Sequence, residues 1–316
     1  MTRWLVVGAG AVGRAHAAAL RHVDGAVLAG FVSLDPIVDP GVPVFADLAA
    51  ALAALRPDAV VIATPHDTHR ALGAVALAAG CPTLFEKPVG LGTGEARALA
   101  AMARERRVAA GAVLNQRACR HHAWIATLVR EGRLRVSSVS FNGALARLGG
   151  WHADPRRAGG GLLRTIGIHY VDLLRWWLGE PLEAWALFAG EPAEDRLVAG
   201  LRFPGGAIAG LQLAATAPRS LGPVRAVIEA DGARLELDGH VLVRADGVPE
   251  PPAPEEPLPG LTFGPGHLAV LREATAALAA GRPFPVTLDD VLPTLALVDR
   301  LSAAAGAAEP PPAPVP

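Results

Sequence analysis

The strongest constraint on the fold of this chain is a glycine-rich turn close to its N-terminus. Residues 4–7 form a short apolar run, and Gly8, Gly10 and Gly13 follow directly, before an alanine-rich helical stretch. Glycines at this spacing between a strand and a helix allow a tight turn, close approach of the backbone to a pyrophosphate, and close packing of the helix. The N-terminus of that helix stabilises phosphate charge. The order of these features predicts a dinucleotide site at the start of the chain.

Apolar runs alternate with helical stretches over the first third of the sequence. Further buried strands are indicated near residues 27–32, 58–63 and 82–85, and helices near 46–55 and 67–79 lie between them. Strands that alternate with helices at this spacing predict a parallel, doubly wound α/β sheet of the Rossmann type.

The pattern changes after about residue 118, where short alternating runs are separated by turn residues. These runs lie near 135–142, 184–190, 196–203, 207–215, 224–230 and 233–244. They predict an α+β domain with a large, mainly antiparallel open sheet. We therefore expect a dinucleotide-binding domain over 1–118 and a substrate-binding and oligomerisation domain over 119–308, with helices near 266–305 able to pack back toward the first domain. Residues 309–316 are rich in proline and predict a disordered tail.

Composition limits the class of partner. The chain has 29 basic and 30 acidic residues, a net charge of -1, so no strong field draws it to nucleic acid or to an anionic membrane. It lacks an uninterrupted apolar run long enough for a membrane span and lacks a cleavable leader pattern, which favours a cytoplasmic location. Cys81 and Cys119 cannot build a disulfide framework or a cysteine zinc site, and no metal is expected. A small-molecule partner is the remaining expectation.

The basic residues are 28 arginines and a single lysine, Lys87. Arginine cannot replace a lysine that must lose and regain a proton, because guanidinium stays protonated. The alternative is that this lysine has no function and was retained by chance. The position of Lys87 in the predicted fold distinguishes the two interpretations. Glu86-Lys87-Pro88 and Thr64-Pro65 each follow a predicted strand, and the carboxyl ends of parallel strands meet at the edge of the sheet where ligands bind. Beside an apolar nicotinamide ring the pKa of Lys87 would be depressed, which suits proton exchange.

Several motifs in order along the chain resemble the glucose–fructose oxidoreductase / inositol dehydrogenase (Gfo/Idh/MocA) family. They are His16 three residues after the glycine turn, Thr64-Pro65 with His69, Glu86-Lys87-Pro88, and Gly159-Gly160-Gly161 followed eight residues later by His169. The resemblance implies NAD(P)-dependent hydride transfer to or from a secondary alcohol or ketone carbon of a sugar, sugar nucleotide, aminosugar or cyclitol. It also implies a homodimer or homotetramer built on the C-terminal sheet.

The resemblance assigns roles to individual residues. Lys87 binds the reacting hydroxyl and takes part in its proton transfer, and His169 hydrogen-bonds or protonates the same oxygen. Many family members carry an acidic residue four positions before that histidine, where this chain has Thr165, which cannot act as a base at neutral pH. The expected catalytic set is Lys87, His169 and Thr165. The expected substrate-binding set is Lys87, Arg117, Trp151, Arg157, Thr165 and His169.

The expected cofactor is NAD or NADP, and the balance favours NAD slightly. The second strand ends at Ser33 instead of the acidic residue that binds the ribose of NAD, and no arginine follows to pair a 2′-phosphate. The expected cofactor-binding set is Gly8, Gly10, Ala11, Val12, Gly13, Ser33, Thr64, Pro65, His66, His69, Glu86, Lys87 and Gln116. Two alternatives stay open: a non-catalytic dinucleotide-binding regulatory protein, which Thr165 favours, and a family member that reduces a non-sugar carbonyl or an imine.

Overall fold

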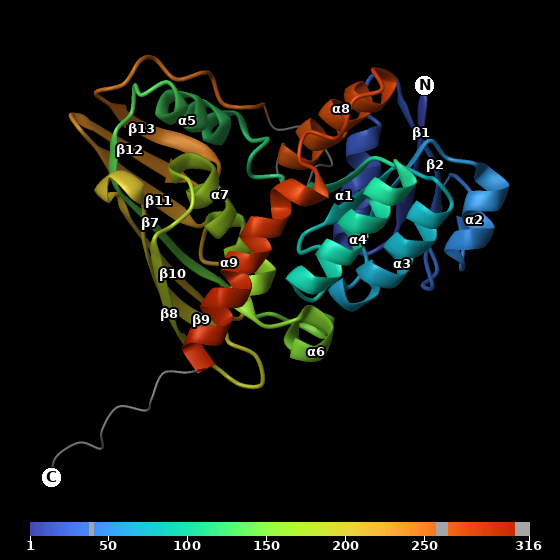
Figure 1. Ribbon diagram of the computed structural model, residues 1–316, viewed down its shortest axis with the longest axis horizontal. Coiled ribbons are helices and arrows are strands. Elements are labelled where there is room, and N and C mark those ends of the chain that lie inside the picture. The colour runs from blue at the N-terminus through green and yellow to red at the C-terminus, as the bar shows by residue number, and fades with distance from the viewer. Residues whose placement is uncertain (38–40, 257–264, 307–316) are drawn as a thin grey trace, which may run out of the picture.

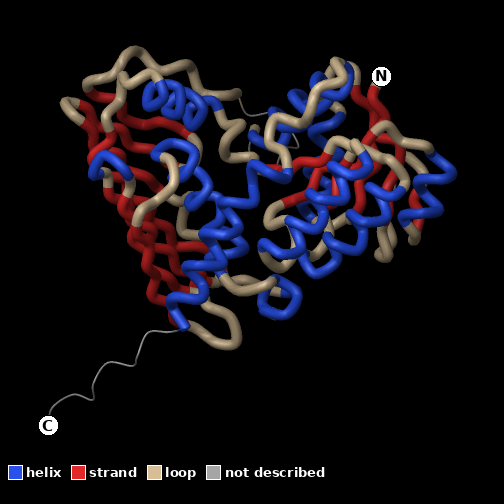
Figure 2. Tube along the Cα trace, viewed as in Figure 1, coloured by secondary structure: helices blue, strands red, loops and turns tan. Residues whose placement is uncertain are grey.

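The computed structural model describes residues 1–37, 41–256 and 265–306. Two β-sheets lie at opposite ends of the molecule, and helices fill the space between them (Figures 1 and 2). The predicted tail at 309–316 lies outside the described residues.

The N-terminal sheet is parallel, as predicted, with the strand order β3-β2-β1-β4-β5-β6. Its strands are β1 Thr2–Val7, β2 Ala26–Val32, β3 Val44–Phe45, β4 Ala59–Ile62, β5 Thr83–Glu86 and β6 Ala110–Val113. The helices of this part are α1 Ala11–Leu20, α2 Leu48–Leu55, α3 His66–Ala78 and α4 Thr93–Arg106. Every residue of β4, β5 and β6 is buried, because helices cover both faces of a parallel sheet.

The second sheet is mainly antiparallel, which confirms the predicted fold class. Its strand order is β13-β12-β11-β7-β10-β9-β8, and the β7–β10 pair is parallel. The strands are β7 Val136–Ala146, β8 Glu183–Ala189, β9 Arg196–Arg202, β10 Ile208–Ala217, β11 Arg225–Ala230, β12 Ala233–Asp238 and β13 Val241–Asp246. The run predicted as one strand over 233–244 is a hairpin, because the chain reverses at Gly239-His240 and Asp238 pairs with Val241.

Some helices of the second part pack on the inner face of this sheet, and others contact the first part of the chain (Figure 1). They are α5 Arg120–Arg130, α6 Pro155–Ala158, α7 Ile168–Leu178, α8 Gly266–Ala279 and α9 Leu288–Gly306, with short 3₁₀ turns at Gly150–Ala153 and Pro204–Gly206. A π-helical turn, Leu163–Gly167, leads into α7. Helix α8 packs on β1 and α1, and the Trp4 indole N–H donates to the Thr275 hydroxyl at 3.1 Å. The C-terminal helices thus return to the N-terminal sheet.

Within the described ranges, the structure contains no helix that combines the length and the apolar character needed to cross a membrane. The division of the chain after residue 118 stays a prediction.

Candidate active site

The glycine turn has the geometry that a bound pyrophosphate requires. Gly8 has a φ of +100°, and a Cβ there would lie 2.5 Å from the Ala63 carbonyl oxygen. At Gly13 a Cβ would lie 1.9 Å from the Gly8 carbonyl oxygen, so both positions demand glycine. Gly10 differs, because a Cβ there would meet no described atom within 4 Å. Gly10 is the N-cap residue of α1. This helix has no side-chain cap and no acidic residue in its first turn. An anion fits such a position.

Lys87 follows β5 and reaches across to the π-helical turn of the second part. Its Nζ donates to the Thr165 carbonyl oxygen at 2.5 Å. Burial lowers the pKa of Lys87, and the negative charge of Glu86 opposes this by raising it. A lysine with a lowered pKa exchanges protons at a pH nearer neutrality than an exposed lysine does.

His169 lies close enough to Lys87 for the two groups to interact electrostatically. Burial lowers the pKa of His169 well below its ordinary value, and the Lys87 charge lowers it further. The imidazole is therefore neutral near pH 7. Its Nδ1 atom is enclosed and has no hydrogen-bond partner among the described residues. Buried polar atoms are normally paired, so an unpaired imidazole nitrogen beside the lysine is a feature that a ligand can complete.

Thr165 contributes its backbone to this site, which differs from the expected use of its hydroxyl. The hydroxyl donates to the Gly161 carbonyl oxygen at 2.8 Å, and the side chain is buried. The hydroxyl is thus engaged within its own turn, and the Thr165 carbonyl is the group that meets Lys87. π-Helical turns occur frequently at functional sites because they change which backbone groups are paired.

Three aromatic side chains line the approach to the lysine. Trp151 stacks on His152 with ring centroids 3.6 Å apart, and it meets the His66 ring edge-on at 4.6 Å. The Lys87 charge lowers the pKa of His66 and of His152, although burial is the larger cause for both. Burial holds the pKa of His66 at about 2, and its Nδ1 donates to the Ala158 carbonyl at 2.9 Å. His66 therefore joins α3 to α6.

The remaining predicted cofactor residues fall into two groups. His69 is fully buried, with ring nitrogens 2.9 Å from the Thr64 carbonyl and 3.0 Å from the Pro88 carbonyl, so it joins two strand ends and has no exposed surface for a ligand. The Ser33 hydroxyl donates to the Asp35 carbonyl at 2.8 Å and shapes the turn after β2. The partly exposed residues at the edge of the site are Ala11, Val12, Thr64, Pro65 and Gln116.

The predicted substrate arginines are held by carboxylates of the chain itself. Arg117 donates from Nε and Nη2 to both oxygens of Asp172, at 2.7 and 2.6 Å. Asp172 is buried and also accepts from the Thr294 hydroxyl at 2.7 Å. A bidentate pair of this kind leaves little of the guanidinium for a substrate, so Arg117, in the turn between β6 and α5, is tied to α7 and α9 through Asp172. Arg157 is exposed and its Nε lies 3.1 Å from Asp67.

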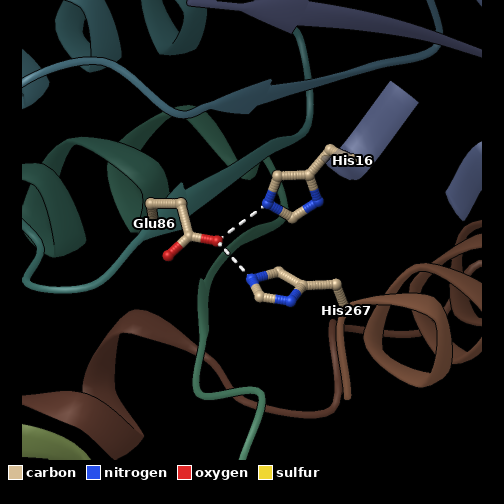
Figure 3. A group of neighbouring side chains, drawn as sticks. All are labelled: His16, Glu86 and His267. Atoms are coloured by element: carbon tan, nitrogen blue, oxygen red, sulfur yellow. Dashed lines mark hydrogen bonds and ion pairs between the residues drawn. The ribbon is translucent and has the colours of Figure 1, made fainter. Parts of the chain in front are cut away.

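Glu86 belongs to a buried cluster that the sequence did not reveal. Its carboxylate accepts hydrogen bonds from His16 on α1 and His267 on α8 (Figure 3). Glu86 was expected to contact the cofactor, but only 7% of its surface is exposed and it faces these two histidines. His267 lies 181 positions after Glu86, and no motif in the sequence marks it.

The fold and the site together define a two-domain α/β protein with a dinucleotide-type glycine turn and a lysine–histidine pair between its two parts. Residues 2–112 match the model of the oxidoreductase family with an NAD-binding Rossmann fold, and residues 125–237 match the GFO/IDH/MocA C-terminal domain. The chain therefore belongs to the Gfo/Idh/MocA family, which confirms the resemblance inferred from its motifs.

Curated relatives are similar over part of their lengths. The chain is 32% identical over 162 residues to 1,5-anhydro-D-fructose reductase of Ensifer adhaerens, which is 48% of this chain and 49% of the relative. It is 32% identical over 142 residues to D-glucoside 3-dehydrogenase of Escherichia coli (strain K12), which is 44% of this chain and 40% of the relative. The matched segments thus span about half of these relatives or less.

Solved structures are similar over nearly the whole chain. GenD2 from gentamicin A biosynthesis, in complex with NAD, has a TM-score of 0.81 and 28% identity, with 97% of this chain and 94% of that chain covered. The WlbA dehydrogenase from Bordetella pertussis, in complex with NADH and UDP-GlcNAcA, has a TM-score of 0.83 and 23% identity, with 96% and 95% covered. At 23% identity, the similarity to the WlbA dehydrogenase shows that the two chains share a fold.

Proposed function

We propose that this chain is an NAD(P)-dependent oxidoreductase that acts on a secondary alcohol or ketone carbon of a sugar, sugar nucleotide, aminosugar or cyclitol. The observation that carries the proposal is the lysine–histidine pair beside the glycine turn. Burial lowers the pKa of Lys87, and Nδ1 of His169 has no hydrogen-bond partner in the part of the chain that the structure describes. The names of the relatives support the substrate class, because they include a reductase of an anhydro sugar and a dehydrogenase of a glucoside.

Each side chain has a defined part in the proposed reaction. In the oxidising direction, the neutral amine of Lys87 accepts the proton of the substrate hydroxyl. The Thr165 carbonyl accepts a hydrogen bond from the resulting ammonium and fixes its direction. Neutral His169 hydrogen-bonds the same substrate oxygen and holds the carbon in place, which supplies acceleration through orientation. A bound nicotinamide would supply the acceptor for the hydride.

The cofactor-binding part of the proposal rests on the turn at Gly8, Gly10 and Gly13, with the first backbone N–H groups of α1 directed at the pyrophosphate. We propose NAD as the preferred form. Ser33 is engaged with the Asp35 backbone, and no arginine accompanies it to pair a 2′-phosphate. The binding constants of NADH and NADPH, measured by fluorescence titration, test this preference, and tighter binding of NADPH would contradict it.

The test of the enzyme proposal is cofactor reduction, followed at the nicotinamide absorbance band, over a panel of sugars, sugar nucleotides, aminosugars and cyclitols. We expect at least one polyol to be oxidised by the wild-type chain and by Arg225→Met, which removes an exposed cation far from the site. Lys87→Met should bind the reduced cofactor and oxidise none of the panel. Cofactor binding by the wild-type chain without turnover of any substrate would support a regulatory protein.

We further propose that two copies of the chain associate through the outer face of the C-terminal sheet. Large apolar side chains are exposed on this face, namely Trp185, Leu187, Val198 and Ile208. They lie on the adjacent strands β8, β9 and β10 and alternate with residues that point inward. A contiguous apolar patch of this kind is typical of a protein–protein interface.

A further inference from the structure

Next to Lys87 lies a buried cluster of one carboxylate and two imidazoles that come from three separate elements (Figure 3). Oε1 of Glu86 accepts from Nε2 of His16 at 2.8 Å and from Nε2 of His267 at 3.3 Å. Oε2 of Glu86 accepts from the backbone N–H of Lys87 at 3.1 Å. Both carboxylate oxygens therefore have donors, and one of those donors belongs to the lysine's own peptide group.

The contacts around the cluster determine where its protons lie. Nδ2 of Asn115 is 3.4 Å from Nδ1 of His267, and an amide nitrogen can only donate. An ionised carboxylate can only accept, so Nε2 of His267 donates to Oε1 of Glu86. Burial lowers the pKa of His16, so its ring is neutral. Burial alone would raise the pKa of Glu86, but the hydrogen bonds from His16 and His267 bring it well below its ordinary value.

Two imidazoles and a carboxylate are also a ligand set that zinc accepts, so the distances must distinguish the two arrangements. Ligands about 2.0–2.1 Å from a tetrahedral ion lie roughly 3.4 Å from one another. Nε2 of His16 is only 2.8 Å from Oε1 of Glu86, which is a hydrogen-bond distance. The geometry favours a directly hydrogen-bonded anion.

We propose that His267, together with His16, holds Glu86 as a buried anion and thereby positions Lys87 and maintains its affinity for a proton. His267 is then a positioning residue for the proposed reaction, supplied by the C-terminal helix α8 to the end of β5. This inference rests on the proposed role of Lys87, but it makes a claim about the lysine that holds with no substrate or cofactor bound.

The physical basis is the balance of charges that act on Lys87. Burial lowers the pKa of the lysine, and Glu86 is the charge that raises it. The other titratable groups that face the lysine are neutral imidazoles: His66 on α3, His152 on the 3₁₀ turn, and His169 on α7. A carboxylate that lost its donors would protonate or move, and the pKa of Lys87 would fall.

Because the chain has one lysine, the test can observe that residue alone. Protein labelled with lysine carrying ¹³C at Cε gives a single side-chain signal, and its chemical shift reports the protonation of Lys87 as the pH is varied. We expect Glu86→Gln, which removes the charge at constant size, to lower the midpoint by about one pH unit. His267→Phe keeps the ring and removes the donor, and it should lower the midpoint in the same direction by a smaller amount.

Two controls separate positioning from folding. His267→Gln retains a donor that can face Glu86 and should return the midpoint toward the wild-type value. Thr275→Val removes the hydrogen bond between α8 and the Trp4 indole on β1, and it should leave the midpoint unchanged. If His267→Phe does not fold, the titration midpoint of Lys87 in Glu86→Gln tests the proposal.

Three outcomes would overturn the proposal. The first is an unchanged midpoint in Glu86→Gln. The second is a wild-type midpoint in a folded His267→Phe protein. The third is one equivalent of a tightly bound metal in the purified wild-type chain, measured by mass spectrometry of its metal content. An inactive wild-type enzyme would leave all three measurements possible, so failure of the proposed function is distinguishable from failure of this inference.

Discussion

The chemical properties of Lys87 depend on the groups around it. In the sequence it is the one lysine beside 28 arginines, and unlike guanidinium its ammonium group can lose a proton and regain it. In the structure its ammonium group meets a backbone carbonyl, and burial lowers its pKa. His169 is nearby with an unpaired nitrogen. Acid–base chemistry on a hydroxyl group needs a group that exchanges protons and a second group that can hydrogen-bond the oxygen.

Replacement of the lysine tests its proposed role directly. Lys87→Arg keeps a positive charge but cannot accept a proton, so kcat should fall by about 10³-fold, within the range typical of a lost general base. The binding constant for the reduced cofactor should stay within about threefold of the wild-type value, since the pyrophosphate binds elsewhere. Steady-state kinetics and fluorescence titration measure the two quantities. Retention of full turnover would remove Lys87 from the mechanism.

The pH dependence of turnover follows from the same residue. In the oxidising direction the neutral amine is the active form, so kcat should rise with pH through the pKa of Lys87. Since burial lowers that pKa, the rise should be complete below the ordinary lysine value of about 10.4. In the reducing direction the ammonium is the active form, and kcat should fall over the same range. The dependence of kcat on pH, measured in both reaction directions, tests this prediction. A kcat that changes with pH in the same direction for both reactions would contradict it.

At the scale of elements, the π-helical turn Leu163–Gly167 is the clearest departure from the predicted structure. From the sequence alone, the residues between the three glycines and Leu178 would be taken as one regular helix. The observed turn engages the Thr165 hydroxyl with Gly161 and leaves the Thr165 carbonyl facing Lys87. Helical periodicity in a sequence cannot distinguish such a turn from a regular α-helix, because the apolar pattern is almost the same.

Thr165→Val tests which part of the threonine matters. The substitution removes the hydroxyl and keeps the carbonyl that accepts from Lys87, so kcat should fall by less than about fivefold, the equivalent of one neutral hydrogen bond. Thr165→Ser, which keeps the hydroxyl, is the matched control. A loss of a hundredfold in Thr165→Val alone would mean that the hydroxyl itself contacts the substrate.

Several elements were not predicted, and for three of them the sequence shows the physical reason. Strand β3 pairs through two residues, and β6 has four residues with two alanines and a glycine, so neither carries a clear apolar pattern. Helix α4 is rich in alanine and charge, with a weak amphipathic stripe. The β12–β13 hairpin was read as one strand because side-chain alternation continues nearly unbroken through its two-residue turn.

At the scale of the whole molecule, the second sheet has helices on one face and an apolar patch on the other. Trp185→Glu combined with Leu187→Glu places like charges in the patch, which repel across a face that meets its own copy, and should convert the proposed dimer to a monomer. Light scattering after size-exclusion chromatography measures the mass. Arg225→Met, on a neighbouring part of the sheet, is the control. A wild-type chain that is monomeric at micromolar concentration would contradict the proposal.

Buried neutral histidines predict how stability depends on pH. Burial lowers the pKa of His122 to about 4 and that of His66 to about 2. Unfolded histidine binds a proton near pH 6.5, so below that pH the unfolded state gains protons that the folded state excludes. The free energy of unfolding should therefore decrease as the pH is lowered below about 6.5. The decrease continues to about pH 4 for His122 and to about pH 2 for His66. Each group contributes roughly 1.4 kcal/mol per pH unit in its window.

Urea unfolding at pH 7, 6 and 5 measures this loss. His122→Gln removes one titrating ring and should make the dependence on pH shallower, whereas replacement of the exposed His22 should leave it unchanged. A slope in His122→Gln equal to that of the wild-type chain would contradict the assignment.

The sequence by itself determined the features that depend on local pattern. The spacing of Gly8, Gly10 and Gly13 predicts a tight turn between a strand and a helix, strand–helix alternation predicts a parallel sheet, and arginine cannot replace Lys87 in proton exchange. Family membership followed from motifs of the same local kind.

Only the tertiary structure decided which groups meet. Arg117 pairs with Asp172, Thr165 offers its carbonyl to Lys87, and His267 reaches Glu86 from a helix near the end of the chain. The physical reason is that periodicity encodes the face of an element that is buried, whereas the atom opposite each polar group depends on how distant elements pack. That packing brings His16 and His267 to the buried carboxylate of Glu86, next to the single lysine.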